Sequence, residues 1–157
     1  ILLEGYAPHG IAILVEAATD NNNRTVANIR SYFNKCDGNL ATSGSVDFLF
    51  NHLCFFQIKD EGLDIEELEL DLIDFGVTDL SKSESEISIT AKFENFGSLQ
   101  KELERRNFDI TSIEFEREAI TLKDLDEDEI IKVDKLINMI DEDDDVQNVY
   151  HNMKSYD

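Results

Sequence analysis

The residues from 4 to 46 constrain the fold most, because a buried strand and a well-marked helix follow each other there. Residues 11–18 read Ile-Ala-Ile-Leu-Val-Glu-Ala-Ala, an almost continuous apolar run that is typical of a central strand covered on both faces. Residues 20–23 interrupt this strand with Asp-Asn-Asn-Asn, which supplies several possible helix N-caps. Val26, Ile29 and Phe33 then fall on one face of a helix predicted for residues 24–35. This part of the chain therefore predicts a sheet that is covered by a helix.

Shorter signals flank this strand and helix. Residues 2–6 read as a short strand, and residues 7–10 form a loop around the only proline of the chain. Gly38 stands where a left-handed C-terminal cap is expected, and a loop of small residues runs from 38 to 45. Val46, Phe48 and Phe50 alternate with less apolar residues, so they predict the next strand.

A second pattern begins at Cys54. Residues 54–58 read as a strand, and Asp64 with Glu67 marks the start of a helix that Gly76 ends. A hairpin follows, with strands at residues 78–82 and 86–93. A helix at residues 96–106 and a strand at residues 110–117 complete the pattern. The resulting order β-α-β-β-α-β is the ferredoxin-like arrangement, and it is complete between about residues 53 and 118.

The rest of the chain predicts a strand at residues 119–122, a helix at 126–141 and a strand at 146–152. These elements supply the β-α-β that the N-terminal half lacks. The sequence therefore predicts an α+β protein with two ferredoxin-like units, the second inserted into the first. The expected domains are residues 1–52 together with 119–157, and residues 53–118.

The charge of the chain is distributed unevenly. The formal net charge of the 157 residues is −21, of which −1 falls on residues 1–59 and −20 on residues 60–157. Nucleic-acid binding depends on Lys and Arg neutralising phosphates, so any nucleic-acid face is expected in the first stretch. No apolar run is long enough for a membrane span, and Cys36 and Cys54 make no metal-binding pattern. We expect a cytoplasmic protein that binds no membrane.

Three ordered blocks of the sequence resemble a known family. They are Glu-Gly-Tyr-x-Pro-x-Gly from Glu4, Asp-Asn-x-Asn-Arg-Thr from Asp20, and Gly-Asn-Leu-x-Thr-Ser-Gly-Ser-Val from Gly38. The resemblance resumes at residues 145–152, Asp-Val-Gln-Asn-Val-Tyr-His-Asn. This combination resembles the YebC/PmpR family, which comprises bacterial regulators of gene expression and the mitochondrial translational activator of cytochrome c oxidase subunit I.

The resemblance implies a DNA-binding transcriptional regulatory protein and the same nested fold. Its mitochondrial members imply an alternative, a translation factor that contacts ribosomal RNA or tRNA. A protein-interaction or small-ligand module is a third alternative, because ferredoxin-like units often serve that purpose. In the family a basic helical domain precedes the position of Ile1, so we expect a fragment. Nucleic acid would then be bound mainly by that absent domain and by loops of the first unit.

The sequence offers little for catalysis, and we predict that the protein is not an enzyme and uses neither cofactor nor metal. Neither a nucleophile elbow nor a phosphate-binding loop motif is present. The acidic residues 141–145 are interpreted as a solvated turn, because consecutive carboxylates do not converge on a metal without a shaped loop.

Topology predicts that three segments rich in family motifs meet on one rim of the first unit, where they would contact nucleic acid or another partner. The predicted rim consists of Tyr6, Pro8, His9, Gly10, Asn39, Thr42, Ser43, Gly44, Tyr150 and His151. Two alternatives stay open: Tyr6 is either a stacking platform or a half-buried strand residue, and the Thr42–Ser43 loop either contacts phosphate or only makes a turn.

A second set of residues begins the first helix. Asp20, Asn21, Asn23, Arg24 and Thr25 are expected either to contact phosphate at the helix N-terminus or to tie the two units together through a carboxylate. The nested topology also predicts that they lie near the junction with the inserted unit.

Overall fold

The computed structural model describes residues 1–155 and divides the chain into two compact units. Unit 1 comprises Ile1–Phe50 together with the chain from Ala119 onward, and unit 2 comprises Asn51–Glu118. No helix among the described residues is both long and apolar enough to cross a membrane.

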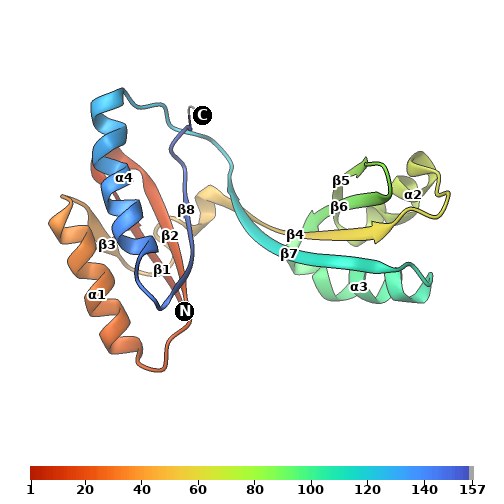
Figure 1. Cartoon of the computed structure of the whole chain (residues 1–157), viewed down its shortest axis with the longest axis horizontal. Coiled ribbons are helices and arrows are strands. Elements are labelled where there is room, and N and C mark those ends of the chain that lie inside the picture. The colour runs from red at the N-terminus through yellow and green to blue at the C-terminus, as the bar shows by residue number, and fades with distance from the viewer. Residues whose placement is uncertain (156–157) are drawn as a thin grey trace. The chain divides into compact units, whose positions relative to one another are not determined.

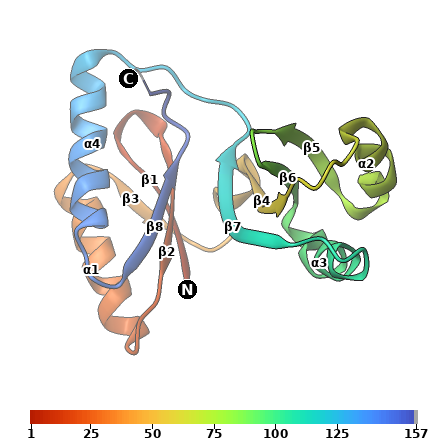
Figure 2. The same ribbon diagram turned by 45° about the vertical axis from the view of Figure 1, so that its right-hand side comes forward.

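Unit 1 contains one antiparallel sheet whose strands run in the order β3-β1-β2-β8 (Figure 1). Helices α1 and α4 cover one face of this sheet, as Figures 1 and 2 show. Its elements are β1 (Leu2–Tyr6), β2 (Ala12–Ala17), α1 (Asn22–Lys35), β3 (Asn39–Ala41), α4 (Glu127–Asp141) and β8 (Val146–His151). Short 3-10 helices occupy Pro8–Gly10 (η1) and Asp47–Leu49 (η2).

Two strand predictions for unit 1 are wrong. Residues 120–122 form no strand, and β1 takes the place in the sheet that they were expected to fill. Residues 47–49 form η2, and Phe48 is 66% exposed instead of pointing inward. Alternating hydrophobicity was misleading here. It indicates that a segment has an apolar face, but it does not show whether another strand pairs with that segment.

The central strand β2 is covered on both faces, as its continuous apolar run predicts. Ile13 and Val15 pack under α1 and α4, whereas Ala12 and Leu14 pack on the opposite face against Val46 and Phe50. The helix face also buries Ile29, Phe33, Val133, Leu136 and Ile140. The segment of residues 46–50 therefore substitutes for a helix layer on the second face of the sheet.

Gly5 lets α1 approach the sheet closely. A Cβ atom at Gly5 would lie 2.7 Å from both the Phe33 ring and the carbonyl oxygen of Asn39. A side chain at this position would displace either the helix or β3.

Unit 2 is a β-α-β-β-α-β unit with strand order β5-β6-β4-β7, so the predicted α+β class with ferredoxin-like units is confirmed. Its elements are β4 (Phe50–Lys59), α2 (Ile65–Leu72), β5 (Val77–Lys82), β6 (Glu86–Lys92), α3 (Phe96–Arg105) and β7 (Ile110–Ala119). Its core joins Phe56, Ile58, Ile89, Leu72 and Leu99, all fully buried. At the start of α2, the Asp64 side chain accepts hydrogen bonds from the N–H groups of Glu66 and Glu67.

The two chain segments that connect unit 1 to unit 2 lie next to each other where they join unit 1. The N–H of Ile120 donates a 3.0 Å hydrogen bond to the carbonyl oxygen of Leu49, just outside β4 and β7. At the other end of the same pair, the N–H of Lys59 donates to the carbonyl oxygen of Asp109. Strands β4 and β7 therefore run antiparallel, and they bring the two ends of the insertion together.

Candidate nucleic-acid interface

The turn between β1 and β2 gathers five of the predicted rim residues at one end of the unit 1 sheet. Tyr6 is paired with Ala12 on one side and with Asn39 on the other. The 3-10 helix Pro8–Gly10 caps this end, closed by a 2.8 Å hydrogen bond from the N–H of Ala7 to the carbonyl oxygen of Ile11. Together, these five residues form the rim of unit 1: Tyr6, Pro8, His9, Gly10 and Asn39.

Within the rim, His9 adopts a left-handed backbone conformation that is uncommon for a residue other than glycine. Its φ is 66°, and Gly10 follows with a φ of 75°. The His9 Nδ1 atom lies 3.1 Å from an Oε2 of Glu129 in the first turn of α4, which fixes the turn against the helix. Non-glycine residues in this region cost free energy and persist only where the surroundings hold them.

Sequence analysis missed three lysines that lie beside this rim. Lys35 at the end of α1 and Lys132 and Lys135 on α4 line one open pocket together with His9. They were missed because nothing in a single sequence shows that residue 35 and residues 132–135 meet. The signal that was available is the spacing of Lys132 and Lys135, three residues apart and thus on one helix face.

The prediction that Thr42, Ser43 and Gly44 share this rim is wrong. Strand β3 begins at the rim, where Asn39 lies opposite Tyr6, and runs away from it until Ala41 lies opposite Glu4. The turn that follows therefore lies beside the middle of β1.

Glu4 explains how this turn is held. Its carboxylate is 2% exposed and accepts hydrogen bonds from the N–H groups of Gly44 (2.6 Å), Val46 (2.9 Å) and Asp47 (2.8 Å). The hydroxyl of Ser45 donates to the carbonyl oxygen of Thr42 at 2.6 Å. The backbone donors that were expected to meet phosphate are thus used by a carboxylate of the same unit.

Strand β8 finishes at the same end of the sheet as the rim, because Asn152, directly after it, hydrogen-bonds to Ala12, the strand partner of Tyr6. Tyr150 is paired with Leu14 and packs with the cluster on the face opposite the helices. His151 is paired with Ile13 and lines a separate open pocket of about 840 Å³ with Asp134 of α4. Burial lowers the pKa of His151, which opposes its protonation.

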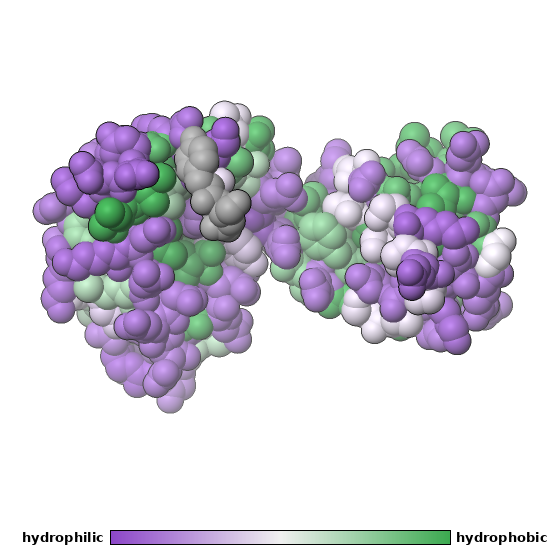
Figure 3. Space-filling view, turned by 45° about the horizontal axis from the view of Figure 1, so that its top comes forward, coloured by the Kyte–Doolittle hydropathy of each residue, from purple (hydrophilic) through white to green (hydrophobic). Residues whose placement is uncertain are grey.

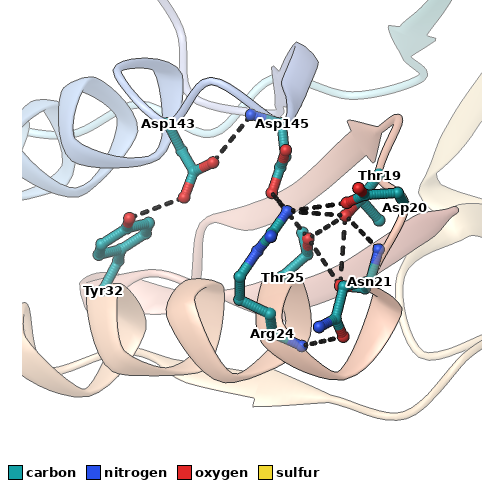
Figure 4. Close-up of polar contacts among 8 residues, drawn as sticks. All are labelled: Thr19, Asp20, Asn21, Arg24, Thr25, Tyr32, Asp143 and Asp145. Atoms are coloured by element: carbon teal, nitrogen blue, oxygen red, sulfur yellow. Dashed lines mark hydrogen bonds and ion pairs between the residues drawn. The ribbon is translucent and has the colours of Figure 1, made fainter.

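The residues at the start of α1 form a polar network within unit 1 (Figure 4). The Asn21 side chain caps the helix by accepting a 3.1 Å hydrogen bond from the N–H of Arg24. Asp145, which precedes β8, accepts hydrogen bonds from the Thr25 hydroxyl at 2.9 Å and the Arg24 guanidinium at 3.3 Å. Arg24 also pairs with Asp20 at 3.2 Å.

This network decides between the two roles expected of Arg24. Its partner carboxylates belong to unit 1, so the expected tie between units is wrong, and the guanidinium already has two anionic partners. The hydrogen bond to Asp145 is the main cause that raises the pKa of Arg24. Asn23 is exposed on the first turn of α1.

The prediction that residues 20–25 lie near the junction is also wrong. They follow the end of β2, whereas the chain leaves unit 1 through Phe50, which packs against Ala12 and Leu14 on the sheet face. The expectation failed because it took residues 46–50 as a strand that runs parallel to β2 and finishes at the same end of the sheet, whereas residues 47–49 form η2.

A second contact joins α1 to the turn before β8. The Tyr32 hydroxyl donates a 2.7 Å hydrogen bond to Asp143, visible in Figure 4. This hydrogen bond, together with burial and the Asp143 charge, raises the pKa of Tyr32 to about 12.

No metal-binding cluster of side chains is found among residues 1–155: no group of three or more His, Cys, Asp or Glu side chains in this range is arranged to hold a metal ion. Cys36 and Cys54 are buried free thiols, and burial raises the pKa of Cys54. The face of the molecule drawn in Figure 3 is largely hydrophilic, with smaller apolar areas.

These features define an α+β protein of two ferredoxin-like units. The model of the family described as "TACO1/YebC second and third domain" matches residues 1–153. The chain belongs to this family, as the resemblance of its motifs predicted.

Curated relatives carry a regulatory name. A protein of Flavobacterium johnsoniae is 61% identical over 98% of the chain, and one of Flavobacterium psychrophilum is 59% identical over 98%. A Parabacteroides distasonis protein is 52% identical over 98%. All three are named probable transcriptional regulatory proteins. The chain spans 65%, 65% and 64% of their respective lengths.

A solved structure supports the fold. The crystal structure of the conserved hypothetical protein Aq1575 from Aquifex aeolicus has a TM-score of 0.68 to the chain and is 34% identical to it. The match covers 98% of the chain and 64% of the Aquifex protein.

Proposed function

We propose that this chain is part of a regulator of gene expression that binds DNA, and that it is not an enzyme. The observation that carries the proposal is membership of a family whose curated members are named probable transcriptional regulatory proteins. We further propose that it acts in the cytoplasm, where a regulator of this kind meets its nucleic acid.

The rim of unit 1 is the part of the chain that we propose contacts the nucleic acid. Tyr6 is 37% exposed and His9, Gly10 and Asn39 are exposed, so side chains and backbone at this end are accessible. Contacts of this kind position a protein on the phosphate backbone and read no sequence by themselves.

A ribosomal target is a second candidate. It is favoured by the family description, which joins TACO1 with YebC, and by the resemblance to the mitochondrial translational activator noted above.

The two candidates are separated by measuring duplex-DNA binding and ribosome co-sedimentation at the same physiological salt. The chain and the longer Flavobacterium johnsoniae relative are measured in parallel. We expect the chain alone to bind duplex DNA weakly, with a dissociation constant above about 1 µM, because its strong negative charge repels the phosphates. Submicromolar binding by the chain, with a steep salt dependence, would contradict this expectation.

The outcome for the longer relative decides the target. DNA binding without ribosome co-sedimentation supports the transcriptional proposal. Ribosome co-sedimentation without DNA binding replaces it with the translational one. Failure to bind either target, by both proteins, overturns the proposed function.

A further inference from the structure

An open pocket of about 290 Å³ lies beside the rim, between the C-terminal end of α1 and the N-terminal half of α4. Lys35, Lys132 and Lys135 line it from the two helices, and His9 and Asp37 line it from the adjoining turns. Three lysines therefore line one pocket in a chain whose net charge is −21.

These lysines differ from Arg24 in the network at the start of α1. Arg24 is held by Asp20 and Asp145, whereas none of the three lysines makes an ion pair with the residues that the structure describes. Asp37 is the one carboxylate that lines the pocket. Lysines that line one pocket repel one another, and an anion bound there would reduce that repulsion.

The position of the lysines is fixed by the core beneath them. Lys35 ends α1 two residues after the fully buried Phe33, and Lys132 and Lys135 flank Val133 and Leu136, which are also fully buried. The turns that complete the pocket are held in left-handed conformations, with φ values of 66° at His9 and 58° at Asp37. His9 is further tied to Glu129 by a contact of 3.1 Å between Nδ1 and Oε2.

We propose that this pocket binds a backbone phosphate of a nucleic acid. The inference rests on the proposed function and adds to it a defined phosphate contact made by unit 1. Three lysines against the single carboxylate of Asp37 give the lining of the pocket a positive net charge, which favours a phosphodiester there. Lysine is a compact, rotatable charge, which suits sequence-independent contact with phosphate rather than base reading.

The test uses the chain with a short single-stranded RNA, a short DNA duplex and inorganic phosphate as separate probes at low salt. The test variant carries K35Q, K132Q and K135Q. The matched control carries K59Q, K92Q and K101Q, which replaces three exposed lysines of unit 2 and gives the same net charge. Circular dichroism and urea unfolding verify that both variants remain folded.

We expect the test variant to lose at least about tenfold in affinity for the nucleic-acid probes and to have a smaller salt slope, by about two to three. The control is expected to change less than about threefold. Backbone amide signals of His9, Asp37 and Lys132 should shift on adding RNA or duplex to the unsubstituted chain. An equal loss of nucleic-acid affinity in both variants, or no shift of these amide signals, would refute the proposed phosphate contact.

The remaining outcomes are also decisive. Shifts with inorganic phosphate but none with either nucleic acid would make this a site for a small anion and refute the nucleic-acid contact. The proposed function fails separately, if the longer relative binds neither DNA nor ribosomes. If nucleic acid binds equally well with and without the three lysines, the proposed function is kept and the proposed phosphate contact of the pocket is refuted.

Discussion

Glu4 is a buried carboxylate whose role is set by the backbone around it. It accepts three N–H groups from residues 44–47 and has a relative exposure of 2%. These bonds fix the segment that carries Val46 and Phe50 onto the open face of the sheet. A single side chain of β1 thereby determines where the chain leaves unit 1.

We expect Glu4→Gln to destabilise unit 1 by about 2 kcal/mol, because charge-assisted hydrogen bonds are lost and an amide NH2 faces backbone donors. Urea unfolding of the variant measures the free energy. Glu142→Gln, an exposed residue of the same unit, is the control and should change it by less than about 0.5 kcal/mol. Equal effects would show that the three hydrogen bonds contribute nothing net.

Glu102 gives unit 2 a pH-dependent contribution. Hydrogen bonds from Arg105 and then Arg106 are the main causes that lower its pKa from 4.5 to about 2. A carboxyl whose pKa is lower in the folded state stabilises the fold above its unfolded pKa and loses that contribution as the pH falls. We therefore expect stability to decline between pH 4.5 and about 2 through this residue.

The measurement is urea unfolding at a series of acidic pH values. Glu102→Gln should flatten the decline over this range, because the substituted side chain does not titrate. Glu104→Gln, an exposed neighbour on α3, should leave the decline unchanged. A decline as steep in Glu102→Gln as in the unsubstituted chain would refute the assignment.

At the scale of elements, the turn before β8 anchors the start of α1. Asp145 accepts hydrogen bonds from Thr25, whose side chain is buried, and from Arg24. This contact joins two elements that are about 120 residues apart in sequence. It fixes the angle at which α1 begins and thus the face of α1 that meets the core.

We expect Asp145→Asn to reduce the free energy of unfolding of unit 1 by about 1.5 kcal/mol, since an amide replaces the charged acceptor of two hydrogen bonds. Asp144→Asn next to it is the control, because Asp144 is exposed, and it should cost less than about 0.5 kcal/mol. Chemical denaturation followed by far-ultraviolet circular dichroism measures both. A cost for Asp144→Asn as large as that for Asp145→Asn would indicate a general effect of charge.

Elements with strong local signals could be predicted from the sequence, and their partners could not. The apolar run of β2 and the face of Val26, Ile29 and Phe33 gave the right strand and helix, because burial on both faces and helical period are local properties. The place of β1 in the sheet depends on pairing with β2 and β3, which no local pattern encodes. Residues 119–122 therefore seemed an equally good strand.

The candidate site was partly predictable for the same reason. The turn with Pro8 and Gly10 carries its own backbone signals, and it does lie at one end of the sheet beside Asn39. The lysine pocket depends on α1 and α4 packing side by side, which is a tertiary property. Ser43 was misplaced because β3 is only three residues long and runs away from the rim.

At the scale of the whole molecule, the inserted unit is contiguous and has a core of its own. Its buried side chains, such as Phe56, Leu72 and Leu103, all come from residues within 51–118. Strands β4 and β7 lie next to each other and bring its ends together. A unit of this kind needs no contact with the rest of the chain to close its sheet.

We expect residues 51–118, expressed alone, to fold and to unfold cooperatively in urea. Far-ultraviolet circular dichroism and dispersed amide signals in an NMR spectrum are the measurements. Leu72→Ala tests whether the isolated segment has a packed core, and it should lower its free energy of unfolding by about 2–4 kcal/mol. A disordered spectrum for the isolated segment would mean that unit 1 is required for its stability.

The paired connections at Leu49 and Ile120 also have a mechanical consequence. A pulling force applied to the two ends of the chain is carried by unit 1, because both tethers of unit 2 are anchored there and bonded to each other. Unit 2 bears no tension until unit 1 ruptures. The load then falls on the adjacent ends of β4 and β7, whose hydrogen bonds open one after another. The order of rupture is therefore imposed by the connectivity, whichever unit is the more stable in solution.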